Sequence, residues 1–386
     1  METAIKLVDR EILEVLYSPV NAFKKIIEKP DFKAVLLVLV LVISSMVISQ
    51  YVLSSKLFLE NRLPENDDWT ESLTNQHSWF SNEVPSVDAV DYQMGNTDGN
   101  HSISSSVLTE TSIWLKIIDV GSINCSEEAG YTELFFWIKW THEAEFSPSS
   151  GTLRLFSGSE DSYFEYDNLV DLLVSSGEWT NTTLKVGPYQ GWSSNNSPDW
   201  QNITAIEFRL DWSSSANLTM KIDGLFFRKY SSPIITGEFS AILPSILLQV
   251  VLDFAMNWIL WAGILILVAK LFNEDLGRWN VFFVIIGYSF IATVVYTLIS
   301  VAPLSALPPL NVPLDANAFN ALLDASWRPL LAYQLWLYIP IIGEVWIAAL
   351  GAVVIRVMKE MTWSKAATIA AVAFAIRFLL SLFLGF

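Results

Sequence analysis

Five stretches of the chain are long, apolar and almost free of charge. At about 1.5 Å of rise per residue, ~20 such residues cross the hydrocarbon core of a bilayer as a helix. The stretches cover residues 34–53, 242–269, 281–301, 330–355 and 366–386. Between the first two, the side chains change to an apolar–polar alternation of period two, which is typical of strands. The pattern predicts a five-helix transmembrane bundle with an all-strand domain inserted after its first helix.

The predicted strands lie within residues 85–230. Their alternation is clearest at 135–140, where successive side chains point to opposite faces. Clusters of Gly, Ser, Asn and Pro separate further runs at residues 113–120, 152–156, 179–186, 203–212 and 218–228. Short alternating strands at this spacing indicate an antiparallel β-sandwich of the jelly-roll kind. The preceding residues 54–84 are polar and irregular, and we expect a stalk there.

An amphipathic lead-in, residues 1–33, precedes the first span. Its apolar side chains recur at helical spacing: Ile5, Val8, Ile12 and Leu16. Such a helix either lies on the membrane surface or packs on its own bundle, and we favour packing on the bundle. Pro19 and Pro30 bracket a second, short helix, because proline starts a helix well and interrupts one from within.

Basic residues set the expected topology. Lys24, Lys25, Lys29 and Lys33 stand directly before the first span. By the positive-inside rule, this end of the chain is cytoplasmic. The later loops on the same side carry Lys270, Arg356, Lys359 and Lys365. We therefore expect a multi-pass protein of the cell membrane, with a cytoplasmic N-terminus and with residues 54–238 and the C-terminus outside.

The net negative charge of the chain is confined to the inserted domain. The 386 residues carry a net charge of −17 although 52% of them are hydrophobic. Residues 56–238 contain 27 acids and 10 bases, whereas the rest of the chain contains 13 of each. This acidity argues against nucleic acid and anionic lipid as partners of the inserted domain. Cys125 is the only cysteine, so no intrachain disulfide forms.

Glycosylation sequons also favour an outside position for the inserted domain. All the Asn-x-Ser/Thr sequons of the chain fall between residues 54 and 238, where an extracytoplasmic location would make them usable. The candidate asparagines are Asn100, Asn124, Asn181, Asn195, Asn202 and Asn217.

The end of the inserted domain resembles a known group of sandwiches. The segments GEWTNTTLKVG, DWQNITAIEFRLDW and ANLTMKIDGLFF are similar to the closing strands of jelly-roll carbohydrate-binding modules. In those relatives an aspartate of the last strand often holds a structural calcium, and the resemblance implies that role for Asp223. The alternative is a turn aspartate that bonds its own backbone.

Three tryptophans of this domain are candidates for sugar binding: Trp192, Trp200 and Trp212. An aromatic ring suits the apolar face of a pyranose, but core packing is the commoner fate of a sandwich tryptophan. Trp192 is the best candidate because it lies in the loop YQGWSSNNSPDW rather than in a strand. The expected partner is an envelope glycan or an envelope protein.

Polar residues interrupt the predicted spans near the middle of the membrane. Gln249, Asp253 and Asn257 recur every fourth residue and form one stripe on a helix. Glu344 and Arg377 fall at a similar depth in the last two spans. An unpaired charge there is costly, so we expect Arg377 to bridge Glu344, Asp253 or both. This cluster either fixes the helix register or binds an ion, a proton or a lipid headgroup.

The membrane part resembles the Yip-domain family of Rab-GTPase-interacting membrane proteins, in its prokaryotic branch. The similar segments are SPVNAFKKIIEKP, IPIIGEVW and MTWSKAATIA. Their anchoring residues are Pro19, Phe23, Pro30, Pro340, Gly343, Trp346, Lys365 and Ala366. In eukaryotic relatives the resemblance implies membrane trafficking through small GTPases. The large insert departs from their compact pattern, which argues against a GTPase partner here.

The sequence carries no motif for catalysis. It contains no P-loop, no glycine-rich dinucleotide motif, no HExxH and no CxxC pair, and the histidines His77, His101 and His142 are scattered. We expect a non-enzymatic prokaryotic membrane protein, archaeal in source, that lies in lipid and displays a sandwich for a glycan or protein. The alternative is a transporter or permease-like protein that uses the midplane polar residues.

Overall fold

The computed structural model describes residues 11–73, 78–93, 99–126, 130–188 and 191–384, with the side chains of the last helix described as far as residue 380. The chain divides into two compact units. The strand unit comprises Leu59–Ser231 and Asn311–Phe319, and the helical unit comprises most of the remainder. The chain therefore contains a strand-rich unit and a helical unit, as the sequence predicts.

Five helical segments of the helical unit are long and apolar enough to cross a membrane: Phe32–Lys56, Glu238–Leu271, Trp279–Ser305, Leu331–Lys359 and Trp363–Leu380. They correspond to α3 (Phe32–Lys56), α4 (Glu238–Leu271), α5 (Trp279–Ser289) with α6 (Ile291–Ser305), α8 (Leu331–Lys359) and α9 (Trp363–Leu384). The third segment is interrupted at Phe290, where α5 ends and α6 begins. Each predicted span thus corresponds to a helical segment of sufficient length and apolarity, with each boundary shifted by a few residues.

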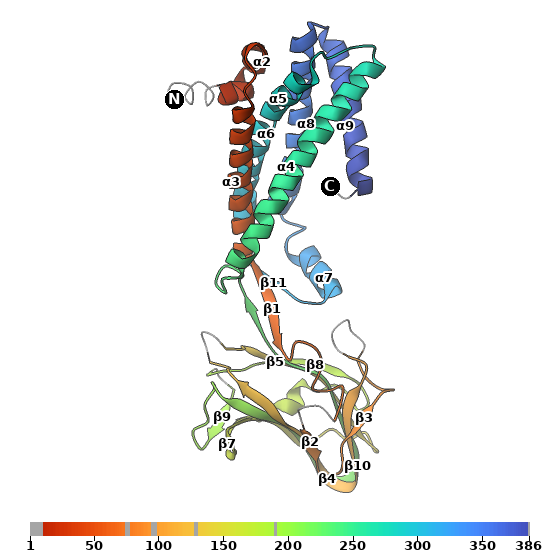
Figure 1. Cartoon of the computed structure of the whole chain (residues 1–386). Helices are drawn as coiled ribbons and strands as arrows, with labels where there is room; N and C mark the ends of the chain where they lie inside the picture. Colours follow the sequence, from red (N-terminus) through yellow and green to blue (C-terminus); the bar gives the residue numbers. More distant parts are fainter. Residues whose placement is uncertain (1–10, 74–77, 94–98, 127–129, 189–190, 385–386) are drawn as a thin grey trace. The chain divides into compact units, whose positions relative to one another are not determined.

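The middle helices form the core of this unit. The helix α6 packs on α3 and α8, and α4 packs on α3 and α9 (Figure 1). The large side chains Trp261, Phe282 and Tyr288 are fully buried between them. At Gly343 the backbone of α8 approaches the ring of Tyr296 on α6, and a Cβ at this position would overlap that ring. A small residue is required there because it lets the two helices come together.

The lead-in packs on its own bundle. Residues 11–17 are helical, and Ile12 and Val15 are buried in the same core as the long helices. Lys25 on α2 (Pro19–Glu28) donates to Glu14 at 2.7 Å. The predicted short helix between two prolines is therefore present, and packing on the bundle is confirmed for the part of the lead-in that is described. Ile5 and Val8 lie outside the described residues.

The strands of the other unit pair antiparallel and form one continuous hydrogen-bonded sheet. They are β1 (Leu57–Leu63), β2 (Ser78–Ser81), β3 (Ser86–Asp88), β4 (Ser102–Ile123), β5 (Glu133–His142), β6 (Ser150–Ser157), β7 (Ser159–Tyr166), β8 (Thr180–Lys185), β9 (Ser193–Asn195), β10 (Ile203–Ser231) and β11 (Leu310–Val312). One helical turn, η1 (Leu169–Leu172), follows β7. The two long strands β4 and β10 run through the whole sheet and pair with each other.

Both long strands take part in two layers. Residues 203–211 of β10 pair with 112–123 of β4 and with β6, and this first layer continues to β7, β9 and β2. Residues 216–231 of β10 pair with the start of β4, with β5 and with β1, and this second layer continues to β8 and β3. The pairing register shifts between Asp211 and Ala216, and Thr109 has a φ of 59°. Such irregularities bend a strand and let it pass from one layer to the other.

The two layers enclose one apolar core. Ile206, Phe208 and Leu210 alternate along β10 with half-buried neighbours, and all three are fully buried. The ring of Phe208 meets the ring of Phe136 from β5, in the second layer, with centroids 4.9 Å apart. The predicted antiparallel sandwich is therefore confirmed.

The predicted stalk is instead part of the sandwich. Residues 54–56 complete α3, β1 pairs with β10, and β2 pairs with β4. Trp69 and Trp79 are buried in the core, and the Trp79 indole N–H donates to the Trp69 carbonyl at 2.7 Å. These two tryptophans anchor the segment in the core although most of its other residues are polar. A count of apolar residues along the segment therefore underestimates how much of it is buried. The sandwich therefore begins near residue 57 rather than residue 85.

A short helix, α7 (Ala316–Ser326), follows β11 between the third and fourth long apolar segments. The strand β11 lies next to β1 at the end of the sheet order.

Candidate functional sites

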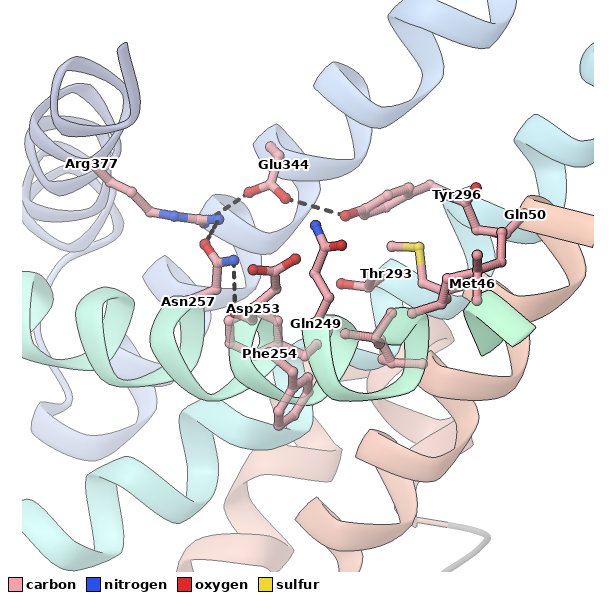
Figure 2. A pocket seen from close by; sticks show the side chains of 15 residues that line it. Met46, Gln50, Gln249, Asp253, Phe254, Asn257, Thr293, Tyr296, Glu344 and Arg377 are labelled. Carbon is pink, nitrogen blue, oxygen red and sulfur yellow. Dashed lines mark hydrogen bonds and ion pairs between the residues drawn. The ribbon is translucent and has the colours of Figure 1, made fainter. Parts of the chain in front are cut away.

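The polar residues predicted for the membrane come together (Figure 2). The stripe on α4 places Gln249, Asp253 and Asn257 on one side of that helix, facing Glu344 on α8 and Arg377 on α9. Arg377 Nη1 lies 2.8 Å from Glu344 Oε2, and Arg377 Nη2 donates to Asn257 Oδ1 at 3.0 Å. The predicted bridge from Arg377 is therefore confirmed for Glu344.

Sequence reasoning missed the polar side chains that other helices contribute. Tyr296 on α6 donates its hydroxyl to Glu344 Oε1 at 3.2 Å. Thr293 on α6 and Gln50 on α3 line the same space. A census of every polar residue within the apolar stretches would have found all three, because each interrupts a run of aliphatic residues.

These side chains surround a cavity of about 360 Å³ inside the helical unit. On α4 its lining extends from Ile242 to Asn257, which is about 22 Å of helix at ~1.5 Å per residue. Gln50 lines it close to the end of α3 that continues into β1. Glu344 and Arg377 line it next to Asn257, at the opposite end. The cavity is therefore elongated, with the ion pair at one end.

Asp253 differs from the other charged residues of the cavity. Its side chain is exposed to the cavity, and no hydrogen bond or ion pair of its carboxylate is found within the described part of the chain. Asn257 donates only to the Asp253 backbone carbonyl, at 2.8 Å. Since Glu344 is paired with Arg377, the cavity holds one carboxylate more than it holds cations.

A second cavity, of about 480 Å³, lies between α4, α8 and α9. Most of its lining is apolar, with Ile264, Ile341 and Phe374 among the contributors. Both cavities share Asn257, Glu344 and Arg377 in their linings. The ion pair therefore lies where the polar cavity and the apolar cavity meet.

In the sandwich, the structure separates the three candidate tryptophans. Trp212 is 5% exposed, and its indole N–H donates to the Phe146 carbonyl at 2.8 Å. It packs on Trp140 with ring centroids 6.0 Å apart. A buried indole leaves no face for a sugar ring, so Trp212 is a core residue and drops out of the candidate set.

Trp192 and Trp200 lie together at the β7–β9 edge, half-buried. Trp200 stacks on Phe164 with centroids 3.7 Å apart, so one of its faces is covered. Trp192 meets the edge of Trp200 at 5.7 Å and packs on Tyr166 at the same distance. Its indole N–H donates to the Lys185 carbonyl at 2.8 Å. The two indoles thus pack against each other and against β7 at this edge. A role for Trp192 in ligand contact stays a prediction.

Sequence reasoning missed a surface on the outward side of the first layer, which we name the charged face. The strand registers place Phe80, Lys116, Glu207, Arg154 and Glu165 side by side across five strands, in that order. Arg154 pairs with Glu165 and lies 3.5 Å from Glu207. Burial raises the pKa of Glu207. In the sequence, each of these residues looks like an ordinary solvent-facing position of a strand. Their proximity is not visible there, because they come from strands that are far apart along the chain.

Aromatic rings flank this row on both sides. Trp114 lies opposite Arg209 in the neighbouring strand, and Phe156 lies opposite Tyr163. Lys116 places its ammonium 3.9 Å from the centre of the Phe156 ring. A cavity of about 250 Å³ opens at this end of the face. Phe156 is only 6% exposed and lies under the Lys116 ammonium, whereas Trp114 and Tyr163 are half-buried. The charged face therefore offers the rings of Trp114 and Tyr163 beside polar groups.

Asp223 lies in the core of the sandwich beside Asp67, and the two are an acid pair. Asp223 is fully buried and accepts from the N–H groups of Gly224, at 2.8 Å, and Gln93, at 2.6 Å. Thr70 donates to Asp67, whose Oδ2 is buried without a hydrogen-bond partner. Burial raises the pKa of Asp67 to about 9 and that of Asp223 to about 6. Either one shared proton or a cation would relieve the repulsion between these carboxyls.

A structural calcium fits this pair only in part. Calcium takes six to eight oxygen ligands. Across the residues described, no group of three or more His, Cys, Asp and Glu side chains is arranged to hold a metal. Asp67, Asp223 and the Thr70 hydroxyl supply a smaller set, and Asp223 also bonds its own backbone neighbour, as the alternative interpretation expected.

The sequon asparagines all belong to the strand unit. Four are exposed: Asn100, Asn181, Asn195 and Asn217. The half-buried Asn124 accepts from Ser126 of its own sequon, and Asn202 accepts from Ser122 at 2.6 Å. The exposed four are the better placed for a glycan.

Comparisons with known proteins identify no family. No family model matches the chain, and no curated protein matches it. The Yip-like character of the helices therefore stays a prediction.

Among solved structures, the strand unit is similar to carbohydrate-binding sandwiches. The Family 11 carbohydrate-binding module of the cellulosomal cellulase Lic26A-Cel5E of Clostridium thermocellum is 13% identical, over 45% of this chain and 94% of that chain, with a TM-score of 0.28. TmCBM61 in complex with β-1,4-galactotriose is 9% identical, over 44% and 97%, with a TM-score of 0.23. An exo-β-agarase is 12% identical, over 44% and 25%, with a TM-score of 0.32. The fold described above rests on strand pairing and burial.

Proposed function

We propose that this chain is a non-enzymatic multi-pass membrane protein whose sandwich binds a neutral glycan of the cell envelope on the charged face. The sandwich lies outside the membrane in this proposal. The observation that carries it is the row of Lys116, Glu207 and Arg154 with aromatic rings on both sides. Sugar hydroxyls need planar donors and acceptors, and the apolar face of a sugar ring needs an aromatic ring.

Charge balance favours a neutral glycan over a polyanion. The outward positions of the first layer carry three bases, Lys116, Arg154 and Arg209. They also carry three acids, Glu165, Glu207 and Asp211. Bases and acids alternate across the strands, and Glu160 also pairs with Lys116 at 3.4 Å, so the face has no excess of bases. A phosphate-rich or sulfated ligand would need an excess of bases.

The test uses the full chain in lipid nanodiscs on an array of envelope glycans. The variant Trp114→Ala removes an indole from the charged face, and Trp192→Ala removes one from the β7–β9 edge. We expect the first to weaken binding at least ~10-fold, since it deletes a stacking surface of about 1.4 kcal/mol or more. The second should leave binding within about twofold.

Two results would contradict this assignment. If only Trp192→Ala weakens binding, the glycan site is the edge cluster that the sequence favoured. If the unaltered protein binds no glycan at all, the sandwich has a protein partner or a purely structural role.

We infer as well that the helical unit is of the Yip-like type. Support comes from residues of the similar segments. Pro19 and Pro30 flank α2, Gly343 gives α8 close contact with α6, and Lys365 pairs with Glu274 at 2.5 Å. A GTPase partner is not part of this proposal.

A further inference from the structure

The polar cavity of the helical unit contains an acid that has no counter-charge. We propose that the cavity binds one alkali metal cation, with the Asp253 carboxylate as its charged ligand. This inference is independent of the glycan proposal, because it concerns other residues in the other unit.

Charge is the first argument. Arg377 Nη1 lies 2.8 Å from Glu344 and Nη2 donates to Asn257 at 3.0 Å, and no ion pair of its guanidinium with Asp253 is found among the described residues. An ionised carboxylate at mid-span depth is costly unless a cation or a proton neutralises it. A single positive charge completes the balance of the cavity, whereas a divalent ion would leave an excess.

The second argument is the kind of ligand that the cavity offers. Besides the charged residues, the lining contains the amide groups of Gln249 and Gln50 and the hydroxyl groups of Thr293 and Tyr296. Figure 2 shows Gln249 and Asp253 pointing from α4 toward the side chains of α6 and α8. Hard cations prefer neutral and anionic oxygen ligands of this type. No histidine or cysteine lines the cavity, so a soft metal is not expected.

The shape of the cavity supplies the third argument. Its lining on α4 extends from Ile242, near the helix start, to Asn257, and Asp253 is fifteen residues into the helix. Gln249 and Gln50 supply polar groups to the lining between Ile242 and Asp253. Beyond the ion pair the space becomes apolar, as the second cavity shows. A hydrated cation can therefore approach Asp253 from one side, and the Arg377–Glu344 pair closes the polar path.

The test is binding of radioactive sodium to the purified full chain in lipid nanodiscs, measured by scintillation proximity. Unlabelled NaCl and KCl compete, and choline chloride keeps the ionic strength constant. We expect saturable binding that Asp253→Asn reduces at least ~10-fold. Thr293→Val, which removes one neutral ligand and keeps the volume, should reduce it less. Asp171→Asn makes the same substitution at an exposed carboxylate of the strand unit and should change nothing.

A folding defect is separated from a binding defect by the elution profile and thermal unfolding of each variant without sodium. If the unaltered protein binds no sodium, or if Asp253→Asn and Asp171→Asn bind equally, the proposal is overturned. Competition by choline as strong as that by KCl would also overturn it, because an organic ammonium would then be the occupant. A proton on Asp253 predicts the first of these results.

Discussion

The buried acid pair of the sandwich makes stability depend on pH. In the unfolded chain, each carboxyl group ionises near its ordinary pKa of about 4. In the folded sandwich, burial raises the pKa of Asp67 to about 9 and that of Asp223 to about 6. The folded state therefore keeps a proton that the unfolded state has lost. The free energy of unfolding falls as pH rises from about 4 toward 9, by up to ~1.4 kcal/mol per pH unit for one proton.

Asp67→Asn should remove much of this slope, because the amide replaces the protonated acid. The measurement is denaturant unfolding of the full chain at several pH values, followed by tryptophan fluorescence. Asp171→Asn, at an exposed position, is the matched control. Equal slopes in both variants would show that the pair does not share a proton.

Calcium provides a second arm of this experiment. If a cation rather than a proton joins Asp67 and Asp223, added calcium stabilises the unaltered sandwich at about pH 8, where Asp223, with a pKa of about 6, is ionised. Asp67→Asn abolishes that stabilisation. A calcium effect of the same size in the variant would rule out a site at this pair.

At the residue level, the sequence indicated both members of the Arg377–Glu344 pair but only one member of the buried acid pair. Arg377, Glu344 and Asp223 stand out, because a charge inside a span and an Asp-Gly step within a strand are local signals. Asp67 does not stand out, since it lies in a polar segment with the appearance of a stalk. Its burial comes from contact with a strand more than 150 residues later, which no local pattern records.

At the level of elements, the contact between α6 and α8 depends on Gly343. A Cβ there would overlap the Tyr296 ring, close to its base rather than at a flexible tip. We expect Gly343→Ala to destabilise the helical unit by about 1–3 kcal/mol through overpacking. It should also disturb the hydrogen bond from Tyr296 to Glu344. Thermal unfolding in nanodiscs measures the loss.

Gly263 on α4 is the matched control, because a Cβ there meets nothing within 4 Å. Gly263→Ala should be neutral or slightly stabilising, since alanine favours helix more than glycine does. If both variants behave alike, the effect at residue 343 is one of helix propensity and not of packing.

Elements whose own sequence carries a continuous hydrophobic or helical pattern were predictable. Elements that depend on pairing with a distant segment were not. The long apolar spans and the helix between Pro19 and Pro30 follow from local chemistry. By contrast, residues 203–212 and 218–228 suggested two strands, whereas β10 (Ile203–Ser231) is one strand that bends between layers. The short strands β2 and β3 owe their existence to pairing with β4, so their own sequences carry little signal.

At the level of the whole molecule, two independent asymmetries point to the same topology. Lysine and arginine are concentrated just before the first apolar stretch and in the segments that follow the second and fourth apolar stretches. Every sequon, by contrast, belongs to the strand unit. Positive residues resist transfer across the membrane, whereas sequons are used only after transfer. Together they favour a cytoplasmic N-terminus and an outside sandwich.

The single native cysteine permits a direct test of this topology. Cys125 is 1% exposed, and burial raises its pKa to about 12, so at neutral pH its thiol is shielded and protonated. An impermeant maleimide should therefore leave the unaltered protein unlabelled. Ser214→Cys introduces a thiol at an exposed position of the sandwich, and Asp275→Cys introduces one in the turn between α4 and α5.

In intact cells, we expect the maleimide to label Ser214→Cys and not Asp275→Cys, and lysis should make both variants reactive. The contrast depends on the membrane alone, since both positions are exposed in the folded chain. The reverse pattern would place the acidic sandwich in the cytoplasm, where an envelope glycan could not reach the charged face. Labelling of both variants in intact cells would mean that the segment between them does not cross the bilayer. Because α4 (Glu238–Leu271) is the helix that separates these two positions, the same result would remove the membrane setting on which a cation at Asp253 depends.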